Sequence, residues 1–281
     1  MFKANQRNPF ISINSHTHKR MQLHSRKYGS GPPVIILHGL LGMSDNWISA
    51  AKSIAERGFC VHLPDLRNHG NSPHADTHRY PDMCEDLIYY LNNEQLESSR
   101  IIGHSMGGKL AMIMSLLHPE RVEKLVVVDI APSDYRKPEN TFHARLISTL
   151  LQMDLSAYTR RSEIRKALEV QTGDNDLAMF LTKNITRDNQ KNTFKWKCNL
   201  PVLYKFIQHL HTGLEDLDLY APCSVQTLFV KGNDSTYYTE EHESDRQHFF
   251  PDSRVIGIDN AGHWLHSQQP AKFLNILANF L

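Results

Sequence analysis

Short apolar runs alternate with amphipathic stretches along the first half of the chain, and this pattern predicts an α/β architecture. The predicted strands are buried apolar runs of four or five residues, which lie at 34–38, 59–63, 100–103 and 125–129. The helical patterns between them lie at 46–57, 80–91 and 109–118. Strands that alternate with helices at this spacing indicate βαβ units, and therefore a mostly parallel central sheet flanked by helices.

The alternation stops after Pro132 and returns only near the C-terminus. Residues 133–220 favour helices and contain no convincing strand. Strand patterns resume at 225–230 and 253–258, and an amphipathic helix is predicted at 270–281. A helical segment inserted between two strands of one sheet predicts a lid over the ends of the strands.

We therefore expect a core formed by residues 1–132 and 221–281, with a helical cap at 133–220. Between residues 136 and 205 the chain has 13 Lys and Arg against 7 Asp and Glu, a local excess of six positive charges. This excess suggests contacts with anionic groups such as the phosphates of coenzyme A. The alternative is an ordinary solvated face, which is the more frequent reason for a charged stretch.

The overall charge and the cysteine spacing narrow the possible partners and locations. A formal charge of +1 over 281 residues does not favour nucleic acid or an anionic membrane surface as the main partner. No apolar stretch reaches membrane-spanning length, and residues 1–17 look like a tail rather than a signal peptide. Cys60, Cys84, Cys198 and Cys223 are scattered, so buried free thiols and a cytoplasmic location are expected.

The peptide Gly103-His-Ser-Met-Gly107 carries the most specific chemical signal in the chain. It fits G-x-S-x-G, a sharp strand-to-helix turn that exposes a serine hydroxyl at the end of a sheet strand. The serine backbone is expected at positive φ, where the neighbouring chain leaves room only for glycine two residues before and after it. Ser105 is therefore the candidate nucleophile.

A serine hydroxyl requires a base to accept its proton, and His263 is the predicted base. It follows the last predicted strand, so we expect it at the same edge of the sheet as Ser105. His266, three residues on, is the less favoured alternative.

A carboxylate should orient the histidine, and the sequence leaves its identity open. Asp129 at the end of the strand 125–129 is favoured over Asp234, which lies in the loop after the strand 225–230. Asp259 is a third, minor alternative. In many enzymes with this arrangement the acid comes three residues after a glycine, but here that position is Ser235.

Two backbone amides are needed to stabilise the oxyanion. We expect them from Met106, directly after the serine, and from Leu40 in the loop that begins at Gly39. His38 is expected to hold that loop by hydrogen bonds rather than to transfer protons. No cluster with metal-ligand spacing is present, so neither a metal nor a cofactor is predicted.

Five segments occur in an order that is typical of a known superfamily. They are HGLLG at 38–42, DLRNHGNSP at 65–73, GHSMGGK at 103–109, VDIAP at 128–132 and AGHW at 261–264. Together they resemble the α/β-hydrolase superfamily, and within it the small esterases similar to bacterial YbfF. The resemblance implies the α/β-hydrolase fold, a triad acid at Asp129, and hydrolysis of carboxylic esters or thioesters, including acyl-CoA, without a cofactor.

The predicted function is thus serine-dependent hydrolysis of a small-molecule ester or thioester through an acyl-enzyme on Ser105. A cofactor-free C–C hydrolase, lyase or perhydrolase on the same triad is one alternative. A ligand-binding protein that keeps a hydrolase shell is another. The pocket is expected to be lined by apolar residues of the cap, with Leu146, Leu150, Trp196, Leu200 and Phe206 as candidates. The sequence predicts neither the acyl length nor the oligomeric state.

Overall fold

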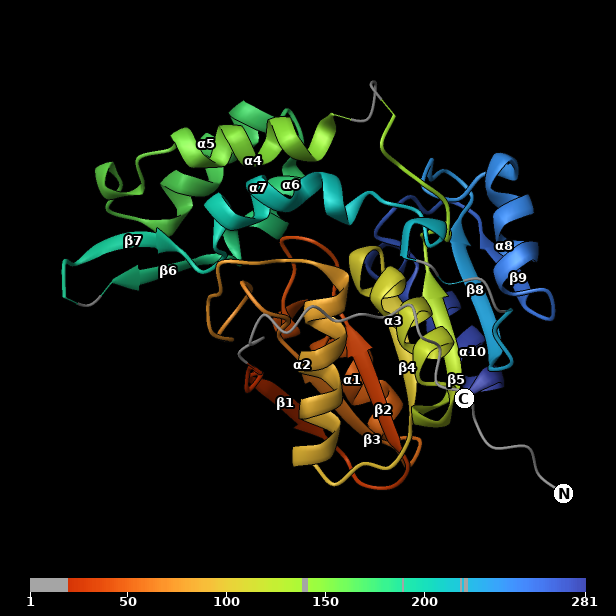
Figure 1. Cartoon of the computed structure of the whole chain (residues 1–281). Coiled ribbons are helices and arrows are strands. Elements are labelled where there is room, and N and C mark those ends of the chain that lie inside the picture. Colours follow the sequence, from red (N-terminus) through yellow and green to blue (C-terminus); the bar gives the residue numbers. More distant parts are fainter. Residues whose placement is uncertain (1–19, 138–140, 189, 218, 220–221) are drawn as a thin grey trace, which may run out of the picture.

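The strand and helix patterns of the sequence fold into one central sheet covered by helices on both faces (Figure 1). The structure is a computed structural model that describes residues 20–137, 141–188, 190–217, 219 and 222–281. The tail expected at residues 1–17 lies outside the described residues.

The sheet is mostly parallel, as predicted. Within the described ranges it has seven strands in the order β1-β3-β2-β4-β5-β8-β9, of which β1 alone runs antiparallel to its neighbour. The strands are β1 (Ser25–Tyr28), β2 (Pro33–Leu37), β3 (Cys60–Pro64), β4 (Ser99–His104), β5 (Val122–Val128), β8 (Gln226–Gly232) and β9 (Arg254–Ile258). The predicted central sheet flanked by helices is therefore present, with β4 and β5 near its centre.

Helices cover the two faces of the sheet, with α1 and α10 on one face and α2, α3 and α8 on the other. Their bounds are α1 (Ile48–Ala55), α2 (Tyr80–Asn93), α3 (Met106–Leu117), α8 (Glu243–Phe249), α9 (Leu265–Gln268) and α10 (Pro270–Phe280). Helix α3 begins directly after Ser105, three residues earlier than predicted. The reason is that Ser105 alone connects β4 to α3. Helix α8 was not predicted, since it is short and mostly polar.

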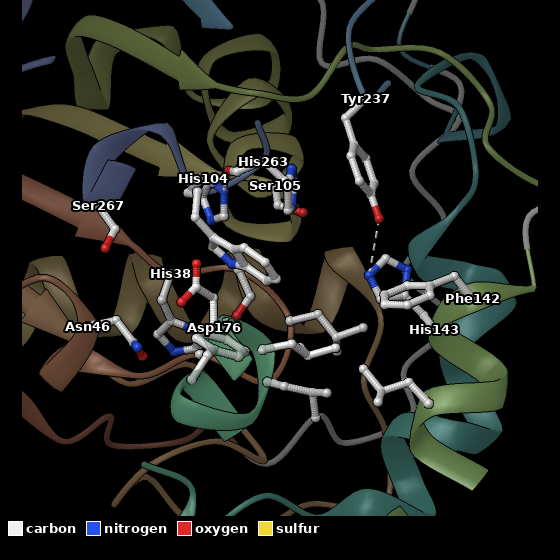
Figure 2. A pocket seen from close by; sticks show the side chains of 18 of the residues that line it. His38, Asn46, His104, Ser105, Phe142, His143, Asp176, Tyr237, His263 and Ser267 are labelled. Atoms are coloured by element: carbon white, nitrogen blue, oxygen red, sulfur yellow. Dashed lines mark hydrogen bonds between the residues drawn. The ribbon is translucent and has the colours of Figure 1, made fainter. Parts of the chain in front are cut away.

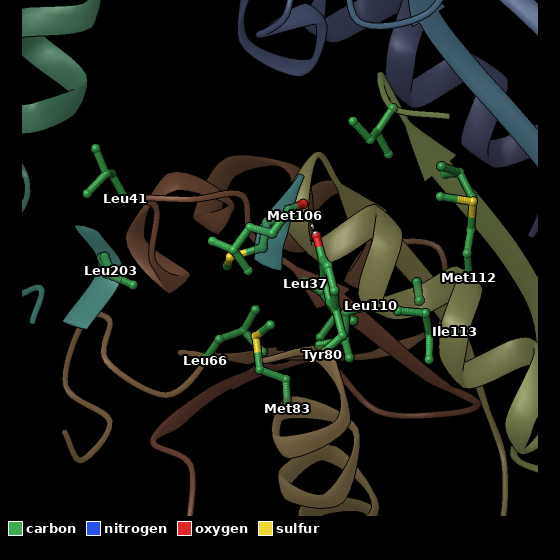
Figure 3. Close-up of a cluster of buried hydrophobic side chains, with 14 of the residues drawn as sticks. Leu37, Leu41, Leu66, Tyr80, Met83, Met106, Leu110, Met112, Ile113 and Leu203 are labelled. Atoms are coloured by element: carbon green, nitrogen blue, oxygen red, sulfur yellow. Dashed lines mark hydrogen bonds between the residues drawn. The ribbon is translucent and has the colours of Figure 1, made fainter. Parts of the chain in front are cut away.

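Alternating side chains of the strands supply the two halves of the core. On β2, Ile35 and Leu37 face α2 and α3, whereas Val34 and Ile36 face α1 and α10. Figure 3 shows Leu37 in the first of these clusters. All four side chains are buried, and such burial stabilises the fold by about 1.5–3 kcal/mol per side chain.

Helices α4 to α7 occupy the chain between β5 and β8 and lie over the carboxyl ends of the strands (Figure 1). They are α4 (Phe142–Gln152), α5 (Arg161–Thr172), α6 (Asn175–Thr182) and α7 (Leu200–Leu210). The expectation that this segment lacks strands is wrong, because β6 (Ile185–Asp188) and β7 (Thr193–Trp196) form an antiparallel pair. Each strand has only four residues, and charged residues interrupt their apolar pattern.

Lys109 on α3 joins the two connections between the core and helices α4 to α7. Its buried ammonium donates to the carbonyl oxygens of Ser133 (2.8 Å), His211 (3.5 Å) and Thr212. The same connections are paired by their backbones, since Tyr135 N–H donates to His211 O at 2.7 Å. Burial lowers the pKa of Lys109 to about 7. This lysine therefore sits where both ends of the inserted segment meet the sheet.

The low pKa of Lys109 predicts a pH-dependent contribution to stability. Its ordinary pKa is 10.5, so between pH 7 and pH 9 the unfolded chain keeps a proton that the folded protein releases. The free energy of unfolding of the wild type should therefore rise over this range relative to that of Lys109→Met. Urea denaturation at pH 7, 8 and 9 measures the difference.

A constant difference between wild type and Lys109→Met across these pH values would contradict the linkage.

Candidate active site

Ser105 occupies a tight turn between β4 and α3. Its backbone has φ 52° and ψ −117°, the strained conformation that the motif predicts. The turn packs directly against the end of β2, so that a Cβ on Gly107 would lie 2.4 Å from Leu37 O. A Cβ on Gly103 would lie 2.3 Å from Gly107 O. Both flanking positions therefore require glycine.

His263 and Asp129 form a hydrogen-bonded pair next to this turn. The Nδ1–H of His263 donates to Asp129 Oδ2 at 2.8 Å. Asp129 is almost completely buried, whereas the His263 side chain is 18% exposed. The bond places the proton on Nδ1 and leaves Nε2 of the imidazole free to act as an acceptor.

The Asp129 carboxylate is held by the loop that follows β8. Gly232 N–H donates to Oδ1 at 3.0 Å, and the Ser235 hydroxyl donates to Oδ2. Asp129 itself has φ 51°, so its backbone turns sharply at the end of β5. A carboxylate with three donors is both satisfied in its buried position and fixed in orientation.

The two alternative acids lie elsewhere. Asp234 is exposed, and its backbone N–H donates to Ala261 O at 3.0 Å. Asp259 is also exposed and accepts a hydrogen bond from Asn233. The structure thus brings only Asp129, of these three carboxylates, to the imidazole of His263.

Ser105 and His263 line the same cavity, which has a volume of about 920 Å³ (Figure 2). Among the described residues the Ser105 hydroxyl has no hydrogen-bond partner. We infer that it pairs with His263 because both residues line the same cavity. The serine–histidine bond of such sites is often long in the absence of substrate.

The two expected oxyanion amides are free to bind a ligand. Neither Leu40 N–H nor Met106 N–H donates to an acceptor in the described part of the chain. Met106 N–H also belongs to the first turn of α3, where the helix dipole favours a negative charge.

Two buried histidines hold the loop that carries Leu40. His38 Nδ1–H donates to Gly39 O at 2.9 Å, and its Nε2 accepts from Leu66 N–H at 2.9 Å. His69 Nε2 accepts from Leu41 N–H at 3.1 Å. Burial lowers the pKa of both imidazoles, so they are neutral and keep these donor and acceptor roles. His38 thus joins the loop at Gly39 to the backbone of Leu66.

The alternative base His266 packs away from the acid. Its ring stacks on Trp47 at a centroid distance of 4.1 Å, and burial lowers its pKa to about 3. His104, which precedes the nucleophile, donates from Nε2 to His263 O at 2.8 Å. His266 thus packs beside the site, whereas His104 fixes the backbone of the proposed base.

Sequence reasoning missed Tyr237 and the role of His104. The Tyr237 ring stacks on His263 at a centroid distance of 4.0 Å, and its N–H donates to Ser235 Oγ at 3.2 Å. The available signal was its position two residues beyond Ser235, in a loop at the edge of the sheet where the site lies.

Only one of the five expected pocket residues lines the cavity. Leu146 does so, beside Phe142, Leu177 and Phe180. The other four candidates are not part of the lining; they are Leu150, Trp196, Leu200 and Phe206. The cause is packing within the inserted segment, since α4 and α7 bury apolar side chains against each other.

The cavity does not display the positive charge expected of the cap. Its charged lining residues are Asp134, Lys137, Asp174, Asp176, Lys183 and Glu241, so carboxylates outnumber ammonium groups. Lys137 is moreover paired with Glu241 at 3.1 Å. Most of the Lys and Arg residues between 136 and 205 are absent from the lining, which therefore gives no support to recognition of phosphate groups.

Among the residues that the structure describes, no group of three His, Cys, Asp or Glu side chains could hold a metal ion. The four cysteines are free thiols; Cys60 is half-buried rather than buried as expected, and the other three are buried. No helix within the described ranges is both long and apolar enough to cross a membrane.

A parallel sheet that carries a nucleophile turn and a histidine–carboxylate pair at its carboxyl edge defines a hydrolase. Residues 32–270 match the family model described as the alpha/beta hydrolase fold. The chain therefore belongs to the α/β-hydrolase family, as its motifs predict.

Its relatives support a more specific placement. The sn-1-specific diacylglycerol lipase ABHD11 of Xenopus tropicalis is 36% identical, over 89% of this chain and 78% of that protein. Esterase YbfF of Escherichia coli is 30% identical, over 89% of this chain and 92% of its own length. A solved structure described as a marine microorganism esterase is 43% identical with a TM-score of 0.88, over 93% of this chain and 100% of that one. The predicted similarity to YbfF is confirmed.

Gly107→Ala tests whether the contact between the nucleophile turn and β2 maintains the site. The added Cβ would press on Leu37 O and His38 O and displace the loop that carries Leu40. We expect ester hydrolysis to fall at least about 10²-fold, the loss typical of a misplaced oxyanion donor. Steady-state kinetics with p-nitrophenyl acetate measure the effect.

Gly262→Ala is the matched control. A Cβ at this position would meet its nearest atom at 3.7 Å, which is ordinary van der Waals contact. Its activity should stay within about threefold of wild type, as for substitutions that create no clash. Equal activity of the two variants would show that the close contact does not matter.

Proposed function

We propose that this chain hydrolyses carboxylic esters through an acyl-enzyme on Ser105, with His263 as the base and Asp129 as the acid that orients it. The observation that carries the proposal is the 2.8 Å bond between His263 Nδ1 and Asp129 Oδ2, beside the cavity that Ser105 lines. Ester hydrolysis also agrees with the relatives, which are named esterases and lipases.

In the first step His263 Nε2 takes the proton of the Ser105 hydroxyl while Oγ attacks the acyl carbon. The amides of Leu40 and Met106 donate to the resulting oxyanion. His263 then gives its proton to the leaving oxygen, the bond between the acyl carbon and that oxygen breaks, and the alcohol departs. Asp129 stabilises the transient imidazolium through Nδ1–H.

In the second step water replaces the alcohol. His263 removes one proton from the water as its oxygen attacks the acyl carbon, and the same amides hold the second oxyanion. The proton returns to Ser105 Oγ when its bond to the acyl carbon breaks. The carboxylic acid leaves, and the enzyme is restored.

The same proposal includes the range of substrates, the division into core and cap, and the location of the protein. Thioesters, including acyl-CoA, remain candidate substrates because the same steps cleave a C–S bond, although the cavity lining does not favour a polyanion. The division into a core at 1–132 and 221–281 and a cap at 133–220 is proposed because α4 to α7 stand over the site (Figure 1). A reducing, cytoplasmic location is proposed from the free thiols.

Substitution of the three proposed triad residues tests the mechanism. Ser105→Ala should lower kcat for p-nitrophenyl acetate at least about 10⁴-fold, because the nucleophile is lost. Asp129→Asn should lower it by about 10³- to 10⁴-fold, because the imidazole loses its orienting acceptor. Stopped-flow or steady-state absorbance at the p-nitrophenolate band measures both.

Asp234→Asn is the internal control for the identity of the acid. Because its carboxylate is exposed and unpaired in the described structure, activity should stay within about twofold of wild type. A collapse of activity in Asp234→Asn, with Asp129→Asn active, would move the acid to the loop after β8. Wild-type enzyme that turns over no ester but cleaves a C–C bond would support the alternative reaction class.

A further inference from the structure

A second, smaller recess adjoins Ser105. Its volume is about 30 Å³, against about 920 Å³ for the main cavity. Leu40 and Met106, the residues of the two oxyanion amides, both line it, and Ile130 and Leu210 add apolar walls. His263 lines the large cavity and not the recess.

Tyr237 and His143 stand between the two spaces and line both of them. The Tyr237 hydroxyl and His143 Nε2 are 3.4 Å apart, the contact drawn as a dashed line in Figure 2. Tyr237 reaches this position from the loop after β8, whereas His143 reaches it from α4. The wall between the two spaces is therefore formed by Tyr237, from a loop of the sheet, and by His143, from the inserted segment.

Contacts with neighbouring residues hold both Tyr237 and His143 in place. The Tyr237 ring stacks on His263, and its carbonyl oxygen accepts from the Tyr135 hydroxyl. His143 Nδ1 lies 3.3 Å from His211 Nε2 at the end of α7. Burial lowers the pKa of His143 to about 3 and that of His211 to about 4, so this wall carries no charge near neutral pH.

The chemistry of the tetrahedral intermediate assigns the two spaces to different parts of the substrate. The leaving oxygen must face His263, which protonates it, so the alcohol part occupies the large cavity. The oxyanion must face the amides of Leu40 and Met106. The acyl chain then takes the space that remains beside Ser105, which is the recess that His263 does not line.

The size of the recess limits the acyl chain. A space of 30 Å³ admits about two water-sized groups beyond the carbonyl carbon. Acetyl and propionyl groups fit this limit, because they have one and two carbon atoms beyond the carbonyl carbon, whereas longer chains would have to displace His143 or Leu210. The large cavity, with Leu146, Leu177 and Phe180 in its wall, accommodates a bulky apolar alcohol.

We propose that this enzyme is selective for short-chain acyl esters of large, uncharged alcohols, and that His143 is the residue that sets the acyl limit. The inference rests on the proposed function, because it assumes an acyl-enzyme on Ser105. It adds the substrate class and a specificity-determining residue to that function.

Hexyl acetate and ethyl hexanoate test the assignment directly, because they are isomers of equal composition with the long chain on opposite sides of the ester. Wild-type kcat/KM, followed by acid release in a pH-stat, should be at least about tenfold higher for hexyl acetate, since each unaccommodated methylene group is discriminated by about that factor. Equal rates, or faster hydrolysis of ethyl hexanoate, would overturn the assignment of the recess to the acyl chain.

His143→Ala should open the recess into the main cavity and reduce that preference to within about threefold, chiefly by raising kcat/KM for ethyl hexanoate. His143→Gln keeps a hydrogen-bonding side chain of similar length and should retain the preference. Arg145→Ala, an exposed site on the same helix outside both linings, should match the wild type. An unchanged preference in folded His143→Ala would remove His143 from the proposal.

Leu210→Phe tests the limit on acyl length by making the recess smaller. The larger ring should fill the recess and lower kcat/KM for p-nitrophenyl propionate relative to the acetate by about tenfold. The wild-type isomer comparison decides the proposal even if a variant does not fold. Failure of the proposed function is distinguishable, because the enzyme would then hydrolyse neither isomer.

Discussion

The turn at Ser105 is pressed against the end of β2, and most of the site depends on this contact. Because the backbones approach so closely, both flanking positions must be glycine and the serine must adopt positive φ. The helix then starts at the next residue, so Met106 lines the recess beside Ser105. One turn of helix later, Lys109 reaches the two connections to α4 and α7. A single backbone constraint thus places the proposed nucleophile, one proposed oxyanion amide and Lys109, which anchors the inserted segment.

The proposed base differs from the other histidines around it in its hydrogen-bond partner and in its place in the cavity. His38, His69, His104 and His266 are desolvated, which lowers the pKa of each and keeps it neutral. They support loops or pack against rings. His263 differs because it has a buried carboxylate on one nitrogen and faces the cavity with its ring. The surrounding imidazoles build a rigid frame without adding charge to the site.

The local parts of this architecture could be predicted from the sequence, because each depends on residues close together in the chain. Such short patterns predict the order of strands and helices and the positive φ of Ser105. They also predict that His38 holds its loop by hydrogen bonds. The choice between Asp129 and Asp234 could not be made by local reasoning alone, since it depends on how the loop after β8 turns. Asp129 faces His263 because Gly232 and Ser235 hold its carboxylate, while Asp234 points to solvent.

The prediction was weakest in the segment between β5 and β8. The strands β6 and β7 were missed, and Leu200 and Phe206 pack inside the fold rather than in the cavity. An amphipathic pattern shows that a helix face is buried, but it does not show whether that face meets a ligand or another helix. Tyr237 was missed for a related reason, since only the folded loop brings its ring onto His263.

The central claim is that Ser105 is a nucleophile activated by the pair His263–Asp129. Reaction with a fluorophosphonate, followed by mass spectrometry of proteolytic peptides, tests it most directly because labelling requires an activated serine. We expect a single adduct on Ser105 in the wild type and labelling slower by orders of magnitude in His263→Ala. An adduct on another residue, or equally fast labelling of Ser105 without His263, would contradict it.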